Sequence, residues 1–211
     1  MKKIVVAGEI YKDKFIEINS YVIDYKGKCF IVDPGYEKEK IQKFVEDNNL
    51  EVLGILLTHS HLDHMSALDV YNVPIYLSSK EYPLFKNHYE HMYTERGLKR
   101  NYSLEGREII PLNEGDSIPF VDKKIEVFFT PGHTIGGVCY KFENDLFTGD
   151  TLFKNSVGRT DFNTGNVHDM RNSILYLLNN LDPNLNVHPD HMDSTTIGEE
   201  IKYNPYYQAW K

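Results

Sequence analysis

The sequence predicts an α+β protein in which two sheet layers pack together and helices lie outside them. Short apolar runs bounded by turn residues recur in both halves of the chain, as strands do. Amphipathic helix patterns at 37–48 and 169–181 each lie between such runs. The sequence contains no low-complexity segment, tandem repeat or linker. We therefore expect one domain spanning residues 1–211.

The first half of the chain is expected to be rich in strands. The predicted strands are 4–7, 15–18, 21–25, 29–32, 52–57 and 74–77. Asp33 follows one of these strands, where it is either a turn residue or a partner that orients a metal-binding histidine. Asp63 is a candidate N-cap for a helix that continues through Val70.

Strand patterns return in the second half, after an aromatic-rich segment at 79–107. The predicted strands there are 109–110, 117–120, 125–129, 138–142 and 146–147. The segment 79–107 reads as partly helical, and the functional alternative considered for it is a lid over the site whose tyrosines contact substrate.

Composition narrows the function classes. The 211 residues carry a formal net charge of −8, which argues against a nucleic-acid partner or an anionic membrane surface. A small-molecule substrate of neutral or mixed charge fits better. The N-terminus lacks a signal-peptide pattern and no stretch is long enough to span a membrane, so we expect a cytoplasmic protein. Cys29 and Cys139 lie in apolar runs and are expected to be buried free thiols.

The stretch 58–64 places potential metal ligands directly after the apolar pattern of 52–57. These ligands are His59, His61, Asp63 and His64. Imidazole nitrogen and carboxylate oxygen suit zinc and the neighbouring first-row metals. Four such side chains at the end of a buried strand would be costly to desolvate without a cation. The sequence therefore predicts a metal site, and one stretch can serve two adjacent metals.

Further ligand-type side chains follow later strand patterns. They are His133, Asp150 and one histidine of His188 and His191. The motifs THSHLDH, PGHT, FTGD and PDH occur in this order, and with them the chain resembles the metallo-β-lactamase superfamily over nearly its whole length. That resemblance implies a four-layer αββα sandwich with its metal site at one edge of the two sheets.

The resemblance also implies roles for the ligands. It assigns His59, His61 and His133 to a first metal, Asp63, His64 and His191 to a second, and Asp150 to both as a bridge. His191 matches the family's late PGHG loop by position, although Asp190 and Met192 replace glycines there, and His188 is the alternative. The implied cofactors are two zinc ions, with iron or manganese as alternatives.

The segments GDTLF and GRTDF resemble the short bacterial hydrolases related to glyoxalase II. This implies a dinuclear zinc enzyme that cleaves a small thioester with a metal-bridging hydroxide, with Asp63 orienting that hydroxide or accepting its proton. Arg159 either pairs with Asp161 to brace the loops or holds a substrate carboxylate. A mononuclear iron persulfide dioxygenase is the alternative function, because such enzymes share the second motif. A non-catalytic metal-binding module is a third, less supported alternative.

Overall fold

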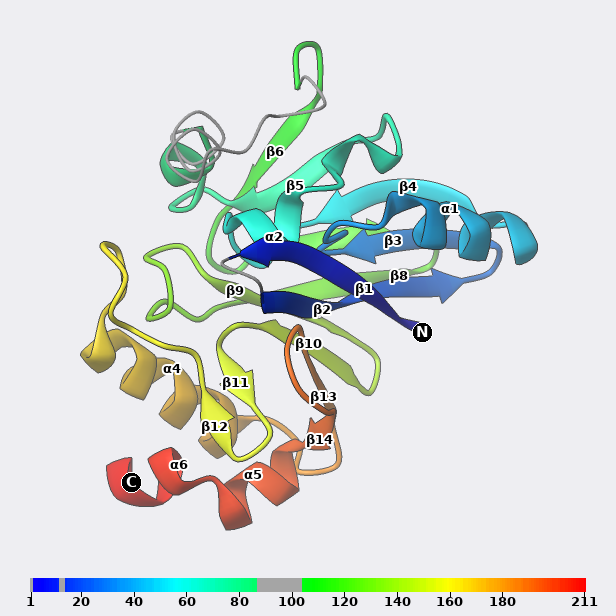
Figure 1. Cartoon of the computed structure of the whole chain (residues 1–211). Coiled ribbons are helices and arrows are strands. Elements are labelled where there is room, and N and C mark those ends of the chain that lie inside the picture. The colour runs from blue at the N-terminus through cyan, green and yellow to red at the C-terminus, as the bar shows by residue number, and fades with distance from the viewer. Residues whose placement is uncertain (1, 12–13, 87–103) are drawn as a thin grey trace. The chain divides into compact units, whose positions relative to one another are not determined.

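The computed structural model describes residues 2–11, 14–86 and 104–211 of the chain (Figure 1). These residues form two compact units, Met1–Leu112 and Asn113–Lys211. Each unit contains one six-stranded sheet together with helices. The prediction of a single domain over 1–211 stays a prediction.

The sheet of the first unit contains six strands in sequence order. They are β1 (Lys2–Tyr11), β2 (Lys14–Tyr25), β3 (Lys28–Val32), β4 (Glu51–Leu56), β5 (Ile75–Ser78) and β6 (Ile109–Leu112). β1, β2 and β3 pair antiparallel, whereas β3, β4, β5 and β6 pair parallel. The two strands expected at 15–18 and 21–25 are thus one long strand, β2.

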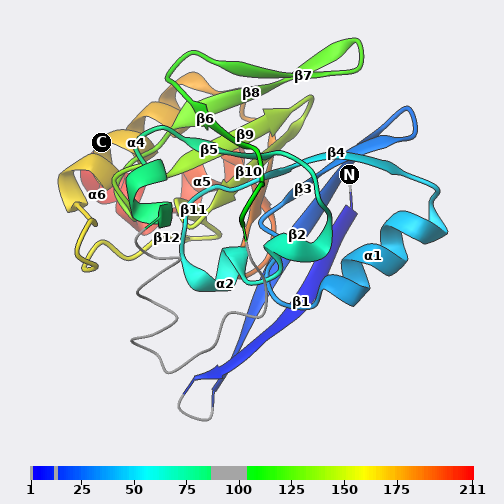
Figure 2. The same ribbon diagram turned by 90° about the horizontal axis from the view of Figure 1, so that it is seen from above.

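Helix α1 (Lys38–Asp47) confirms the amphipathic pattern predicted for 37–48. Its apolar side chains Ile41 and Val45 are buried in a cluster with residues of the sheet, among them Ile31 and Ile55. Figure 2 shows α1 beside the strands of this unit. Burial of this apolar stripe, rather than helix propensity, holds the helix on the sheet.

The helix expected from Asp63 to Val70 is wrong. The chain instead forms a single turn, α2 (Leu62–Met65), and a 3-10 turn, η1 (Leu68–Val70), and Asp63 lies inside α2 rather than at its cap. Beyond the break, the Arg107 guanidinium donates to the carbonyl oxygens of Leu68 (3.0 Å) and Val73 (2.9 Å). These backbone groups are thereby satisfied without a continuous helix.

The sheet of the second unit has the order β14-β13-β10-β9-β8-β7. Its strands are β7 (Ser117–Phe120), β8 (Lys123–Phe129), β9 (Val138–Phe142), β10 (Asp145–Gly149), β13 (Asn186–Pro189) and β14 (Thr195–Thr196). β8, β9 and β10 pair antiparallel, whereas β10 and β13 pair parallel. A small hairpin of β11 (Leu152–Phe153) and β12 (Ser156–Val157) follows β10.

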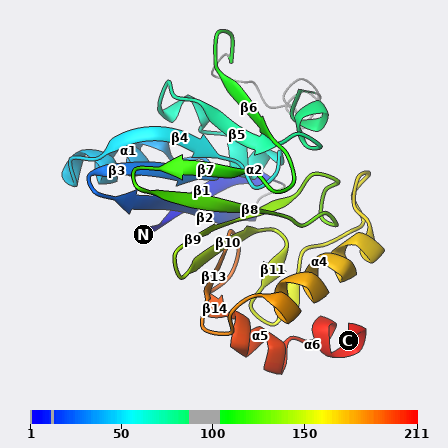
Figure 3. The same cartoon turned by 180° about the vertical axis from the view of Figure 1, so that it is seen from behind.

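The other elements of this unit are helices, which Figure 3 labels α4, α5 and α6. They are α4 (Val167–Asn180), α5 (Ile197–Tyr203) and α6 (Pro205–Trp210). Residues of all three helices, such as Met170 of α4, join one buried cluster with residues of the sheet, such as Val187 of β13. α4 confirms the predicted helix and begins two residues earlier, where Asn166 caps it. α5 and α6 were not predicted, since helices of seven and six residues show too little periodicity.

The α+β fold class is confirmed by these mixed sheets and their helices. Cys29 and Cys139 are buried free thiols, as expected, and burial raises the pKa of each to about 12. Within the described ranges, no helix is both long and apolar enough to cross a membrane. Residues 87–103, most of the segment 79–107 for which a lid was considered, lie outside the described residues.

The packing of Gly54 in β4 gives a test of this sheet. A Cβ atom at Gly54 would lie 2.8 Å from ring carbons of both Phe30 and Tyr76, on the two neighbouring strands. We expect Gly54→Val to lower the free energy of unfolding by about 1–3 kcal/mol through overpacking, although valine favours strands. Urea unfolding measures the change. The control Glu51→Val alters an exposed side chain of the same strand, and equal stability of both variants would contradict this packing.

Candidate metal centre

The parallel strands of the first unit gather polar side chains at one sheet edge. β3 and β4 run parallel, so their carboxyl ends lie at the same edge. Asp33 directly follows β3, and the stretch 58–64 closely follows β4. Asp33, His59 and His64 are all buried there, and they offer ligand-type atoms that lie within 4.8 Å of one another.

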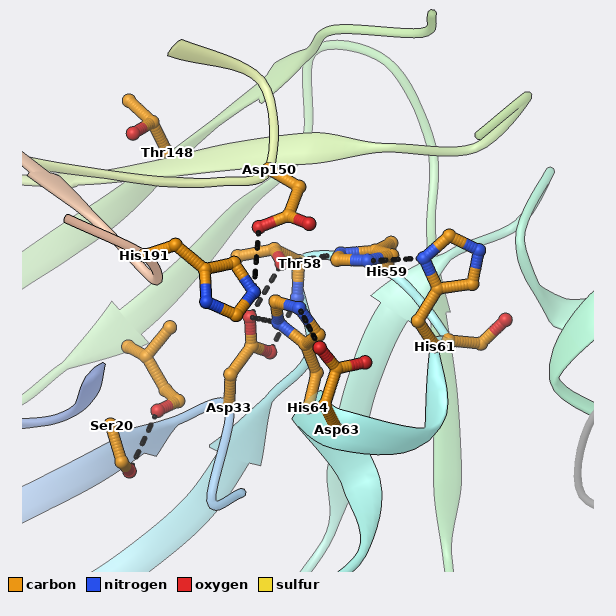
Figure 4. A network of polar contacts seen from close by, with 12 residues as sticks. Ser20, Asp33, Thr58, His59, His61, Asp63, His64, Thr148, Asp150 and His191 are labelled. Carbon is orange, nitrogen blue, oxygen red and sulfur yellow. Dashed lines mark hydrogen bonds and ion pairs between the residues drawn. The ribbon is translucent and has the colours of Figure 1, made fainter. Parts of the chain in front are cut away.

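The Asp33 carboxylate holds this cluster together (Figure 4). It accepts hydrogen bonds from the Thr58 amide (2.8 Å), the Thr58 hydroxyl (2.5 Å) and Nδ1 of His64 (3.0 Å). The Thr58 hydroxyl gives its only hydrogen to Asp33, so it must accept from Nδ1 of His59, 3.0 Å away. Asp33 thus places the Nδ1 hydrogen on both His59 and His64, so Nε2 is the nitrogen of each ring that carries a lone pair.

The remaining ligand candidates of this stretch lie beside these rings. Nε2 of His59 lies 3.0 Å from Nδ1 of His61, and Nε2 of His64 lies 3.8 Å from a carboxylate oxygen of Asp63. Two nitrogens on one tetrahedral zinc are roughly 3.3 Å apart, given Zn–N bonds near 2.0–2.1 Å. His59 with His61, and His64 with Asp63, therefore form two pairs of metal-ligand type within the first unit (Figure 4).

The second unit repeats the arrangement with three other side chains. β8, β10 and β13 all run in one direction, because β9 lies antiparallel between β8 and β10 and β13 is parallel to β10. His133 comes after β8, Asp150 after β10 and His191 after β13. Strands of one direction end at one edge of the sheet, so three loops distant in sequence bring these side chains together.

The Asp150 carboxylate faces one imidazole with each of its oxygens. Oδ2 lies 3.3 Å from Nε2 of His133, and Oδ1 lies 3.6 Å from Nε2 of His191. Nδ1 of His133 donates to the carbonyl oxygen of Arg159 (2.7 Å), which fixes the tautomer and leaves its Nε2 as an acceptor. Gly158 packs tightly here, because a Cβ would lie 1.7 Å from the Asp150 carbonyl oxygen. The Asp150 carboxylate is thus held between the two imidazoles.

His188, the alternative ligand of the last loop, is engaged elsewhere. Its Nε2 donates to the carboxylate of Asp145 (2.8 Å) and its Nδ1 lies 3.1 Å from the Ser194 hydroxyl. The hydrogen bond from His188 lowers the pKa of Asp145. Met192 adopts a left-handed φ of 70° where the family loop has glycine, so this departure is accommodated by backbone strain. The contacts favour His191 as the ligand.

Arg159 makes the ion pair with Asp161. Its Nε and Nη2 donate to the two carboxylate oxygens at 2.6 and 2.7 Å, and the guanidinium lies 4.3 Å from the centre of the Phe162 ring. Both charged side chains are mostly exposed, so the pair adds little stability. Arg159 contacts a metal-ligand candidate through its backbone carbonyl oxygen, which accepts from His133, and not through its guanidinium. Substrate binding by Arg159 stays a prediction.

The donor set fits a divalent metal of the zinc or iron type. Neutral imidazole nitrogens and carboxylate oxygens predominate, and the rings are oriented through their other nitrogens. The sequence did not reveal Thr58 as the link between Asp33 and His59. The signal for it was present, since a hydroxyl stands between the strand and the first histidine. Of the two roles considered for Asp33, the structure shows that it orients a histidine.

Comparisons with known proteins agree with this geometry. The family model described as the metallo-beta-lactamase superfamily matches residues 14–191. The chain belongs to this superfamily. With that membership and its His/Asp cluster, it is a metal-dependent hydrolase.

Individual relatives and solved structures are similar to the chain over most of its length. It is 30% identical over 191 residues to the probable polyketide biosynthesis zinc-dependent hydrolase PksB of Bacillus subtilis, covering 87% of this chain and 77% of that protein. The solved structure of TTHA1623 in a di-iron-bound form has a TM-score of 0.81 at 29% identity, over 98% of this chain and 100% of that one. The B3 metallo-beta-lactamase BLEG-1 has a TM-score of 0.78 at 30% identity, over 97% and 99%.

The network around Asp33 predicts the effect of Asp33→Asn. Asparagine tolerates the left-handed φ of 43° at this position, so the backbone is little disturbed. The new amide turns one acceptor into a donor that faces another donor. We expect about 10–100-fold weaker zinc binding and a loss of about 1–3 kcal/mol in stability. Isothermal titration and urea unfolding measure these changes.

Asp69→Asn is the matched control, because this carboxylate pairs with Lys38 and both side chains are partly exposed. It should leave zinc affinity unchanged. Unchanged zinc affinity in Asp33→Asn as well would contradict the role given to Asp33.

Proposed function

We propose that this protein is a dinuclear zinc hydrolase that cleaves a small thioester. The observation that carries the proposal is Asp150, whose two carboxylate oxygens each face a different imidazole. A carboxylate in this arrangement suits two neighbouring metals, and two-metal hydrolases hold their metals about 3.5–4 Å apart.

The ligand assignment follows the superfamily pattern. The first metal is assigned to His59, His61 and His133, the second to Asp63, His64 and His191, and Asp150 is shared. Support comes from the tautomers within each unit, because His59, His64 and His133 each present Nε2. Such metals, when bound, lower the pKa of a shared water and stabilise negative charge on oxygen.

Asp63 is assigned the catalytic role. Its carboxylate is only 19% exposed and lies 3.8 Å from Nε2 of His64. It orients the attacking water and takes its proton. Water adds to the thioester carbonyl carbon, the carbon–sulfur bond breaks, and a carboxylic acid and a thiol leave. No covalent enzyme intermediate is required.

The proposal of a thioester substrate rests on sequence motifs other than those that contain the metal ligands. The segments GDTLF and GRTDF are the ones in which the sequence resembles short glyoxalase II-like hydrolases. PksB is named as a zinc-dependent hydrolase, which supports zinc, whereas the di-iron form of TTHA1623 keeps iron as an alternative metal. The similarity to BLEG-1 makes β-lactams the second substrate class to test.

Metal analysis together with activity assays tests the function. We expect about two zinc ions per chain and zinc-dependent release of thiol from S-acyl glutathione substrates. Parallel assays follow β-lactam hydrolysis and oxygen uptake with a persulfide. One iron per chain with oxygen consumption would contradict the proposal and favour the dioxygenase, and β-lactam turnover alone would replace the substrate class.

Paired histidine variants test the ligand assignment. We expect His191→Ala to bind one metal fewer and to lose at least about 100-fold in kcat/KM, because a ligand of the second metal is gone. His188→Ala should keep both metals, because this ring pairs with Asp145. Metal content and thioester hydrolysis are measured on both proteins, and the reverse pattern would overturn the assignment.

A further inference from the structure

Glu81 is a fully buried carboxylate outside the proposed ligand set. It lies three residues beyond the end of β5, in the turn that precedes a short helical stretch at 82–86. Its amide donates to the Ser78 carbonyl oxygen (3.0 Å), which fixes the turn to the strand. A buried carboxylate must be hydrogen-bonded to be tolerated, so its partners indicate its role.

The partners of Glu81 lie in the metal-ligand stretch. Its Oε1 accepts hydrogen bonds from the Ser60 amide (2.9 Å) and from the Ser60 hydroxyl (2.7 Å). Ser60 is itself buried and stands between His59 and His61. Two hydrogen bonds to one charged oxygen hold the centre of the turn that carries these two rings.

The sheet explains why this contact exists. β4 and β5 pair parallel, so the ligand stretch after β4 and the turn with Glu81 after β5 lie at the same edge. Asp33, after β3, holds the same stretch from the other neighbouring strand through Thr58 and His64. The stretch 58–64 therefore makes hydrogen bonds to a buried carboxylate on each side. One carboxylate follows each of the two flanking parallel strands.

We propose that Glu81 is a positioning residue for the first metal, holding Ser60 so that Nε2 of His59 and Nδ1 of His61 converge on one cation. The inference rests on the proposed dinuclear centre. Without this brace, the turn samples geometries in which the two nitrogens, now 3.0 Å apart, no longer face one point. Preorganised ligands lose less entropy on binding, so removal of the brace weakens metal affinity.

The test measures zinc affinity of the purified full chain by competition with a chromophoric chelator. We expect Glu81→Ala to bind the zinc equivalent assigned to the first metal about 10–100-fold less tightly than the wild type. Glu81→Gln keeps an oxygen acceptor and should retain most of the affinity.

Ser60→Ala removes only the hydroxyl contact and should lose less zinc affinity than Glu81→Ala. The double variant should lose no more affinity than Glu81→Ala alone, because both substitutions remove the same contact.

Glu200→Ala is the matched control. Glu200 is also fully buried and accepts hydrogen bonds from the Asn155 amide, Thr195 and Asn204, all outside the ligand set. It reports what general destabilisation does to zinc binding, and urea unfolding compares the stability of the two variants. An equal loss of zinc affinity in Glu200→Ala would overturn the proposal, because the loss of any buried structural carboxylate would then explain the weaker binding.

The outcomes separate this inference from the proposed function. Wild-type affinity in folded Glu81→Ala, while the wild type binds two zinc ions, overturns the role of Glu81 alone. A wild-type protein that binds no zinc, iron or manganese overturns both. If Glu81→Ala does not fold, Ser60→Ala decides: weaker zinc binding supports the proposal and unchanged binding refutes it.

Discussion

The buried carboxylate of Asp33 is the interaction on which the first half of the candidate metal centre depends. It accepts from the Thr58 amide and hydroxyl and from His64, and through Thr58 it also orients His59. Desolvating a carboxylate is expensive, and these hydrogen bonds offset that cost. The same hydrogen bonds decide which nitrogen of each ring keeps a lone pair. A requirement of folding therefore also determines which atoms can bind a metal.

Strand direction explains how such a site is assembled in both units. Side chains that follow strands of one direction meet at one sheet edge, whatever their separation in the sequence. In the first unit this brings Asp33 and Glu81 to the ligand stretch from opposite sides. In the second it brings His133 and His191 to Asp150. Each unit therefore supplies ligands that are already oriented within its own structure.

The sequence anticipated the elements with strong periodic patterns and missed those without them. Helices α1 and α4 and most strands were predicted, because each buries a recurrent apolar face. The helix expected from Asp63 to Val70 is wrong: the chain forms two single turns there, and Arg107, far along the chain, donates to the carbonyl oxygens of Leu68 and Val73 beyond the break. α5 and α6 were missed because side-chain caps and a packed position, rather than periodicity, define such short helices.

The sequence by itself determined the kind of chemistry, because the types and order of the histidines and aspartates in strand-end motifs indicate a metal-dependent hydrolase of this superfamily. Only the tertiary structure decided how these side chains are held. Spacing cannot tell that His188 turns to Asp145 while His191 turns to Asp150, nor that Glu81 reaches Ser60. These choices depend on which strands lie side by side and in which direction, and that is a property of the folded sheet.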